Sequence, residues 1–231
     1  MLILALDTAS RYCSAAIMRD GEIIAEQTVC SGLVHSKTLM VLVDNVLKSV
    51  NLKAEDIDLF ACSSGPGSFT GIRIAVSTVK GLAIKDNKPC IGVSTLQAAA
   101  ECAACPDCIV CAILDARCSQ VYAAAYLNGE GIIEPEPMLL ADLLERLKDK
   151  NRVVFCGDGV SVHRDAIKHE LGDKAYFAQA TQGYQRAAGV ACVAHRLYGS
   201  GISTNCFELD ATYLRLSQAE REYAAKHGND K

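Results

Sequence analysis

Leu4-Ala5-Leu6-Asp7 and Ala112-Ile113-Leu114-Asp115 are two apolar stretches that each end in an aspartate, 108 residues apart. A second apolar stretch and a polar turn follow each of them at the same offset, Ala15-Ala16 matching Ala123-Ala124 and Asp20-Gly21 matching Asn128-Gly129. The shared order of elements indicates a duplication, and its period has the size of a domain rather than of a solenoid repeat. We therefore expect two related domains, residues 1–107 and a trimmed copy over residues 108–231.

Composition limits the class of protein. The 231 residues are 50% hydrophobic and 22% charged, with a net charge of −4, which is typical of a globular chain and excludes disorder. That balance also argues against a large basic surface for nucleic acid. No uncharged apolar run reaches the ~18 residues of a membrane span, and the first residues lack the basic region of a signal peptide. We expect a cytoplasmic protein with no membrane contact.

Alternation of strand and helix patterns predicts a mixed α/β sheet in each half. In the first half we expect strands at Leu2–Leu6, Tyr12–Met18, Ile23–Val29, Leu59–Ser63 and Cys90–Val93, and helices at Leu39–Val50 and Ser68–Ile84. After its own meander, the second half is expected to form a helix at Leu139–Leu147, a strand at Val153–Cys156, helices around Ala166 and Ala191, and a charged helix at Gln218–Asp230.

The segment Gly65-Pro66-Gly67-Ser68-Phe69-Thr70-Gly71-Ile72-Arg73 joins a predicted strand to a predicted helix. Ser68 or Thr70 can cap that helix. A glycine-rich loop at a helix N-terminus also suits an anion, and Arg73 adds positive charge. The spacing is neither that of a P-loop nor that of a dinucleotide fingerprint. A tight, capped connection is the favoured interpretation.

The two strand-terminal aspartates, Asp7 and Asp115, are expected to face each other across a cleft between the domains. Carboxylates at such a position can hold Mg²⁺ with a nucleotide, and Thr8 and Ser10 could bind phosphate oxygens. However, neither turn after the aspartates contains the glycine that lets a backbone approach phosphate closely. The alternative is that each aspartate only orders its turn.

His35-Ser36 and the cysteines are two further candidate features. Adjacent helical residues do not face each other, so we favour Ser36 as a helix cap and His35 as a polar surface group over a nucleophile pair. Four of the twelve cysteines are crowded together, at Cys102, Cys105, Cys108 and Cys111. The first three have the spacing of a ferredoxin loop, but the fourth comes one residue early. We favour cysteine used as a small hydrophobe and predict no metal site.

The two long helices of the first half carry more apolar surface than one core can cover. The helix over Ser68–Ile84 is apolar nearly all round, and Met40 and Val41 lie beyond the core stripe of the preceding helix. A partner could cover this surface. A helix buried deeply within the chain itself is the alternative.

Taken with Leu4-Ala5-Leu6-Asp7-Thr8 and Leu114-Asp115-Ala116-Arg117, the Gly65–Arg73 string resembles the bacterial TsaB (YeaZ) family over most of the chain. Tyr213-Leu214-Arg215 also resembles a family feature. The resemblance implies two duplicated actin-like (ASKHA, ribonuclease-H-like) domains with mixed sheets flanked by helices. It further implies a role in making N6-threonylcarbamoyladenosine at position 37 of tRNA. The family is glycoprotease-like and a paralogue of TsaD, which transfers the threonylcarbamoyl group.

The same resemblance implies a non-catalytic scaffold subunit. The metal-binding His-x-x-x-His pair of TsaD corresponds here to Thr95 and Ala99, which cannot replace an imidazole ligand. The implied partners are TsaD, through it TsaE and tRNA, and a second copy of the chain. The implied interface is a helical bundle at His35, Met40, Val41, Asp44, Phe69, Arg73, Val76 and Lys80.

Two matters stay open at this stage. No cofactor is expected to bind tightly, but ATP or ADP with Mg²⁺ could sit in the cleft, at Asp7, Thr8 and Asp115, or at the partner interface. A free-standing nucleotide-dependent phosphotransferase of the same fold, using Asp7 and Asp115, is the alternative function. A peptidase is disfavoured because the sequence has neither a zinc signature nor an identifiable triad.

Overall fold

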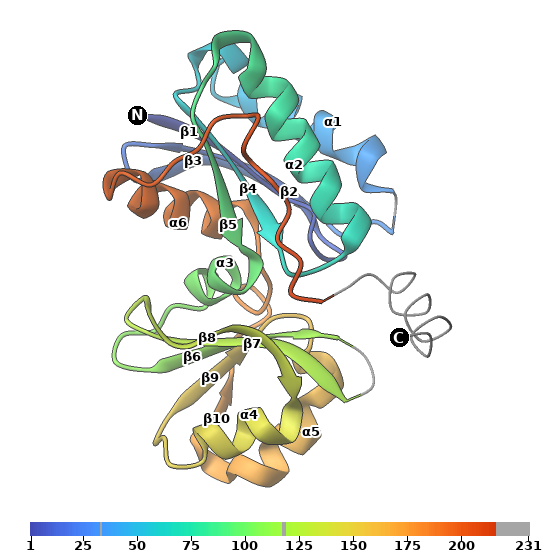
Figure 1. Ribbon diagram of the computed structural model, residues 1–231, viewed down its shortest axis with the longest axis vertical. Coiled ribbons are helices and arrows are strands. Elements are labelled where there is room, and N and C mark those ends of the chain that lie inside the picture. The colour runs from blue at the N-terminus through green and yellow to red at the C-terminus, as the bar shows by residue number, and fades with distance from the viewer. Residues whose placement is uncertain (33, 117–118, 216–231) are drawn as a thin grey trace, which may run out of the picture.

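The computed structural model describes residues 1–32, 34–116 and 119–215 (Figure 1). It contains two five-stranded sheets with the orders β3-β2-β1-β4-β5 and β10-β9-β6-β7-β8. Counted from the meander outward, the two orders are the same. The predicted duplication and the mixed α/β class are therefore confirmed.

Each half builds the same succession of elements. The first sheet consists of β1 (Leu2–Asp7), β2 (Cys13–Arg19), β3 (Glu22–Val29), β4 (Leu59–Gly65) and β5 (Cys90–Ser94). The second consists of β6 (Ile109–Asp115), β7 (Gln120–Leu127), β8 (Glu130–Leu139), β9 (Val153–Cys156) and β10 (Ala175–Phe177). The helices are α1 (His35–Ser49), α2 (Phe69–Ala83), α3 (Thr95–Cys102), α4 (Leu140–Leu147), α5 (Val160–Leu171) and α6 (Ala187–Gly199). Equivalent strands therefore precede α1 and α4, α2 and α5, and α3 and α6.

The two meanders turn where the sequence predicts. Asp20 and Gly21 have φ angles of 49° and 91°, and Asn128 and Gly129 have 51° and 85°. Positive φ at both central residues is the requirement of a type I′ hairpin, which Asx-Gly pairs meet at least steric cost. β1 pairs antiparallel with β2 and parallel with β4, so the carboxyl ends of β1 and β4 lie at the same edge of the sheet.

Helices cover both faces of the first sheet. Leu4 and Leu6 of β1 share a core with α1 and α2, whereas the alternate residues Ile3 and Ala5 share a core with α6. This alternation follows from the two-residue period of a strand. A helix on each face explains why the central strands read as apolar runs.

The second sheet is covered by α4 and α5 on one face and by α3 on the other. The helix that follows the last strand of each half thus lies between the two sheets (Figure 1). Because α6 packs on β1, β2, β4 and β5, the structure does not follow the prediction that all of residues 108–231 belong to the second domain. Residues 187–215 return to the first one.

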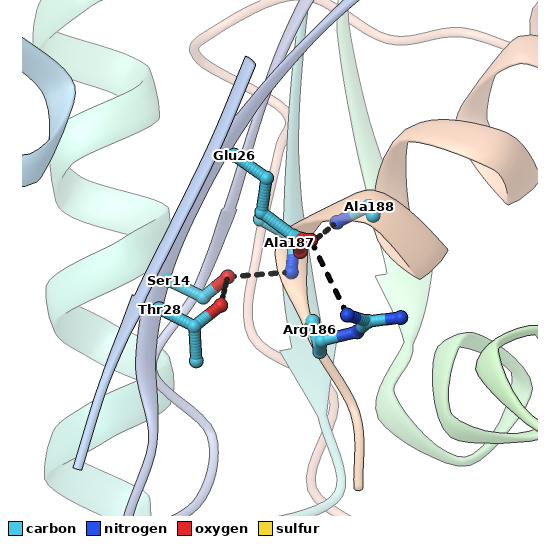
Figure 2. A network of polar contacts seen from close by, with 6 residues as sticks. All are labelled: Ser14, Glu26, Thr28, Arg186, Ala187 and Ala188. Carbon is cyan, nitrogen blue, oxygen red and sulfur yellow. Dashed lines mark hydrogen bonds and ion pairs between the residues drawn. The ribbon is translucent and has the colours of Figure 1, made fainter. Parts of the chain in front are cut away.

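Polar groups of the first sheet hold the start of α6 (Figure 2). The Ser14 hydroxyl accepts a hydrogen bond from the Ala187 amide at 2.8 Å, and the Glu26 carboxylate accepts one from the Ala188 amide at 3.2 Å. Glu26 also pairs with Arg186 at 3.4 Å. These contacts satisfy free N–H groups that no side chain at the start of α6 itself caps.

The chain after α6 also lies on the first domain. Thr204 forms a bridge with Cys90, and the Thr212 amide donates to the Ser64 carbonyl oxygen at 2.7 Å. The charged helix predicted at Gln218–Asp230 lies outside the described residues. In the described part of the chain, no helix is long and apolar enough to cross a membrane.

Candidate functional site

A groove of about 430 Å³ lies on the surface between α1 and α2. Its lining residues are Ser36, Leu39, Met40, Thr70, Arg73, Ile74, Ser77 and Thr78. The groove thus combines an apolar floor with hydroxyl groups and one cation. Two of the predicted interface residues, Met40 and Arg73, meet here.

The outer side of α1 carries exposed apolar side chains next to this groove. The exposed fractions are 48% for Met40, 56% for Val41 and 59% for Val34, the residue that precedes the helix. Asp44 is also exposed and pairs with Lys48 at 2.6 Å. Apolar side chains gathered beside a groove are typical of a surface that another protein covers.

The start of α1 differs from the sequence prediction. Val34 occupies the cap position, no side chain caps the helix, and Ser36 is exposed, so the prediction of Ser36 as the cap is wrong. His35 fastens this end instead, because its Nε2 donates to the Ser10 carbonyl oxygen at 2.7 Å. The half-buried imidazole therefore serves as a tether rather than as a freely exposed surface group.

Two aromatic rings hold Arg73 at the groove. Its guanidinium carbon lies 4.1 Å from the centre of the Phe69 ring and 5.6 Å from that of Tyr213. Nε of Arg73 donates to the Tyr213 hydroxyl at 2.8 Å, and the two rings stack at 4.4 Å. Cation–π contact and stacking restrict the long side chain. Sequence reasoning missed Tyr213 as a site residue, although its Tyr-Leu-Arg motif was a signal.

Val76 does not belong to this surface. It is 5% exposed and lies in the core shared by α1, α2 and the first sheet, so its prediction as a contact residue is corrected. An all-round apolar helix hides which of its faces is internal. Lys80, one turn further along α2, is half-buried.

A second cavity, of about 570 Å³, lies between the two domains. The first domain lines it with Ala9, Ser10, Arg11 and the Pro66–Phe69 loop, and the second with Leu114, Asp115, Ala116, Tyr122 and Asp158. The segment Thr212–Arg215 completes the wall. This is the predicted cleft, and Asp115 borders it.

Asp7 does not line the cleft. Its carboxylate is 1% exposed and accepts hydrogen bonds from the Ser63 hydroxyl and from the Ala9 amide. Burial raises the pKa of Asp7 to about 6, although both hydrogen bonds act to lower it. Thr8 is also buried and donates to the Gly71 carbonyl oxygen at 2.6 Å. Neither residue lines the cavity, which was the expectation for both.

Glycines of the Gly65–Arg73 string let the chain approach itself. A Cβ atom at Gly71 would lie 1.9 Å from the Thr8 carbonyl oxygen, and one at Gly67 would lie 2.4 Å from that of Ala9. Ser68 caps α2 by accepting from the Gly71 amide at 3.2 Å, as predicted. The glycines therefore let this loop pack closely against the backbone after β1, and that backbone occupies the space in which a phosphate could otherwise approach the loop.

Asp115 is placed differently from Asp7. Its side chain is 35% exposed and lies 3.6 Å from Nε2 of His163, while its amide donates to the Asp158 carboxylate at 3.2 Å. Burial raises the pKa of Asp158. The Arg215 guanidinium reaches the Ala116 carbonyl oxygen at 3.3 Å. Carboxylates at this cavity therefore come from the second half of the chain.

The positions predicted to replace the TsaD metal ligands are internal. Thr95 and Ala99 are fully buried in α3, and hydroxyl and methyl groups are poor substitutes for imidazole. Within residues 1–32, 34–116 and 119–215, no three His, Cys, Asp or Glu side chains are grouped so that they could hold a metal ion.

Comparison with known proteins identifies the family. Residues 31–223 match the family model described as TsaD, tRNA N6-adenosine threonylcarbamoyltransferase. The tRNA threonylcarbamoyladenosine biosynthesis protein TsaB of Bacillus subtilis is 32% identical over 228 residues, which cover 96% of this chain and 98% of that protein. The chain belongs to the TsaB family.

Solved structures agree with this membership. YeaZ from Pseudomonas aeruginosa superposes with a TM-score of 0.77 at 25% identity, covering 92% of this chain and 99% of that one. The activator of the 2-hydroxyisocaproyl-CoA dehydratase from Clostridium difficile, with bound ADPNP, superposes with a TM-score of 0.54 at 13% identity, covering 92% and 100%. The second likeness shows the fold alone. The duplicated α/β architecture with mixed sheets flanked by helices, which the TsaB string implied, is thereby confirmed.

Proposed function

We propose that this chain is a non-catalytic scaffold subunit for the threonylcarbamoyladenosine modification of tRNA, and that it binds a TsaD-type transferase through α1 and α2. The B. subtilis relative carries threonylcarbamoyladenosine biosynthesis in its name, and the matching family model is that of the transferase. The observation that carries the proposal is the α1–α2 groove with its exposed Met40, together with the exposed Val41 on the outer side of α1.

The chemistry of this surface suits a helical partner. Met40 offers an adaptable apolar side chain, and the polar rim of Ser36, Thr70 and Ser77 surrounds it. Arg73, held against the Phe69 ring and by the Tyr213 hydroxyl, presents a guanidinium at little further entropic cost, which is typical of a residue that dominates binding energy. A second copy of the chain could use the same groove, so self-association and transferase binding would compete.

A scaffold role also agrees with the interior of the cleft. Phosphate donors would be needed at the turn after β1, but the Ala9 amide is bonded to Asp7 and the Thr8 hydroxyl to Gly71. The alternative phosphotransferase therefore lacks a phosphate-binding turn in the first domain. If ATP or ADP binds with Mg²⁺ in this cleft, Asp115 and Asp158 are the carboxylates that would contact the metal ion. We propose no site that binds a nucleotide tightly.

The partner would supply the contacts to nucleic acid. A net charge of −4 makes a strong phosphate-binding surface on this subunit unfavourable. We therefore propose that tRNA binds to the complex through TsaD. We also propose that TsaE binds through TsaD, and that the complex acts in the cytoplasm.

Reconstitution tests the proposal. The cognate TsaD and TsaE are incubated with tRNA and threonylcarbamoyl-adenylate, with and without this chain, and the modified nucleoside is quantified by mass spectrometry. We expect the amount of modified nucleoside to increase at least tenfold when the folded chain is added. We expect no modified nucleoside when Mg-ATP and this chain are supplied without TsaD. Equal product without this chain would contradict the proposal.

A further inference from the structure

Two cysteines lie side by side where the chain passes from the first domain to the second. Cys105-Pro106-Asp107-Cys108 forms the turn between α3 and β6, and the two Sγ atoms are 2.8 Å apart. Asp107 has a φ of 57°, and its amide donates to the Asn128 side chain of the β7–β8 hairpin at 3.1 Å. The turn is thus held in a shape that brings both thiols together.

The two thiols differ in access. Cys105 is half-buried and lines a cavity of about 680 Å³ next to Glu101, Tyr126 and Arg196. Cys108 is only 2% exposed, and its hydrogen bond with Cys105 raises the pKa of the Cys108 thiol. An accessible thiol beside a protected one is the arrangement needed for an attacking and a resolving cysteine.

The neighbouring cysteines do not share this geometry. Cys111 is fully buried in β6, and the half-buried Cys102 thiol interacts with Arg186. No group of three or more His, Cys, Asp or Glu side chains suited to a metal ion exists in the described ranges. The crowded sequence run therefore contains one thiol pair with two separate cysteines beside it.

We propose that Cys105 and Cys108 are a site of reversible disulfide formation by exchange with a low-molecular-weight disulfide such as oxidised glutathione. The Cys105 thiolate attacks one sulfur of the disulfide, giving a mixed disulfide and releasing one glutathione thiolate. The Cys108 thiolate then attacks Cys105 Sγ and releases the second. In total, two protein thiols are oxidised and one glutathione disulfide is reduced to two thiols, which take up the two protons.

The bond would close a loop of only four residues, so its entropic effect on stability is small and the reaction itself is the appropriate readout. A reducing compartment would keep the pair as thiols, and oxidation would be transient. The site lies apart from the α1–α2 groove, and its test does not depend on the proposed scaffold role.

The chain sequence allows a direct assay. The full-length protein is equilibrated in buffers of reduced and oxidised glutathione, unfolded with iodoacetamide present, and cleaved before aspartate and after glutamate. Cleavage then falls between Pro106 and Asp107 and after Glu101, giving peptides 102–106 and 107–114. These peptides stay joined only when a disulfide connects them. Fragmentation of the joined pair in the wild type identifies the two cysteines.

We expect the joined pair to become the main species as oxidised glutathione rises, and to fall at least tenfold in Cys105→Ser and in Cys108→Ser. The matched control Cys102→Ser, in the same peptide, should retain it. The proposal is overturned if the pair persists in either of the first two variants. It is also overturned if Cys105 and Cys108 stay alkylated when the exposed Cys30 carries glutathione, or if Cys105 accumulates only the mixed disulfide.

Discussion

The ends of β1 and β6 occupy the same place in the two halves, yet their aspartates do different things. Asp7 is buried beneath the Gly65–Arg73 string, where its carboxylate accepts hydrogen bonds from the Ser63 hydroxyl and from the Ala9 amide of the turn that follows β1. Asp115 remains 35% exposed at the interdomain cavity, beside His163 and Asp158. In the first half, the Thr8 and Ala9 carbonyl oxygens after β1 pack against Gly71 and Gly67. In the second half, the Asp115 side chain stays partly exposed while its amide bonds to Asp158.

The helices show the same division. α1 and α2 have fifteen residues each and carry the groove, whereas their counterparts α4 and α5 have eight and twelve. The duplicated fold thus places the α1–α2 groove in one half and the cleft carboxylates in the other. Substitutions at equivalent places should therefore have unequal effects.

The largest expected effect is on the closed loop of the first half. Gly71→Ala would place a methyl group 1.9 Å from the Thr8 carbonyl oxygen, and such a clash should lower the free energy of unfolding by about 3 kcal/mol or more. Gly81→Ala, in the same helix but facing open space, should raise it by up to ~1 kcal/mol. Urea denaturation measures both. Equal values would show that the loop is not closed.

Asp7 should give the next largest effect, through pH. Its folded pKa of about 6 exceeds the ordinary value of 3.8, so the folded state holds the proton more tightly. The stability from Asp7 is complete below about pH 4 and is lost as pH rises through 6. The loss should approach 3 kcal/mol, at 1.36 kcal/mol per pKa unit.

Asp7→Asn cannot titrate and provides the reference. Denaturation at pH 4.5 and 7.5 should show the wild type losing stability relative to the variant at the higher pH. Ser63→Ala should widen the difference, because the Ser63 hydroxyl lowers the pKa of Asp7. A difference independent of pH would contradict the raised pKa of the buried Asp7 carboxylate.

A smaller effect concerns the link by which the second half of the sequence returns to the first sheet. Ser14→Ala removes the acceptor for the Ala187 amide and should cost about 1 kcal/mol, the usual worth of a helix cap. Ser161→Ala, at an exposed hydroxyl in α5, should cost less than ~0.5 kcal/mol. Hydrogen exchange at Ala187 should quicken only in the first variant; faster exchange in both would contradict this.

Local patterns were sufficient for most of the elements, although they did not predict the short strand β10 (Ala175–Phe177). The Asx-Gly pairs fixed both hairpins through their φ angles, and Ser68 was found as a cap because its acceptor lies three residues from the amide it meets. The 108-residue offset, read with strand order, predicted the repeated sheet. Each of these signals depends on residues close together in the sequence or on their repetition.

Contacts between distant residues could not be predicted in this way. Ser14 and Ala187 are 173 residues apart, so nothing local indicated that α6 packs on the first sheet. The buried Asp7 carboxylate is satisfied by Ser63, which lies 56 residues away in the sequence. Val76 was misplaced because α2 has apolar residues on most faces, and only the sheet beneath decides which of them is internal.

Binding of the cognate TsaD, measured by titration calorimetry, tests the central claim most directly. The wild type is compared with Met40→Glu on α1 and with Val162→Glu on α5, two exposed apolar positions, 48% and 61% accessible, in opposite halves. Circular dichroism first confirms that both variants are folded. We predict that Met40→Glu weakens binding about 100-fold or more, and that Val162→Glu changes it less than about twofold. Unchanged affinity in Met40→Glu, or an equal loss in Val162→Glu, would contradict the account.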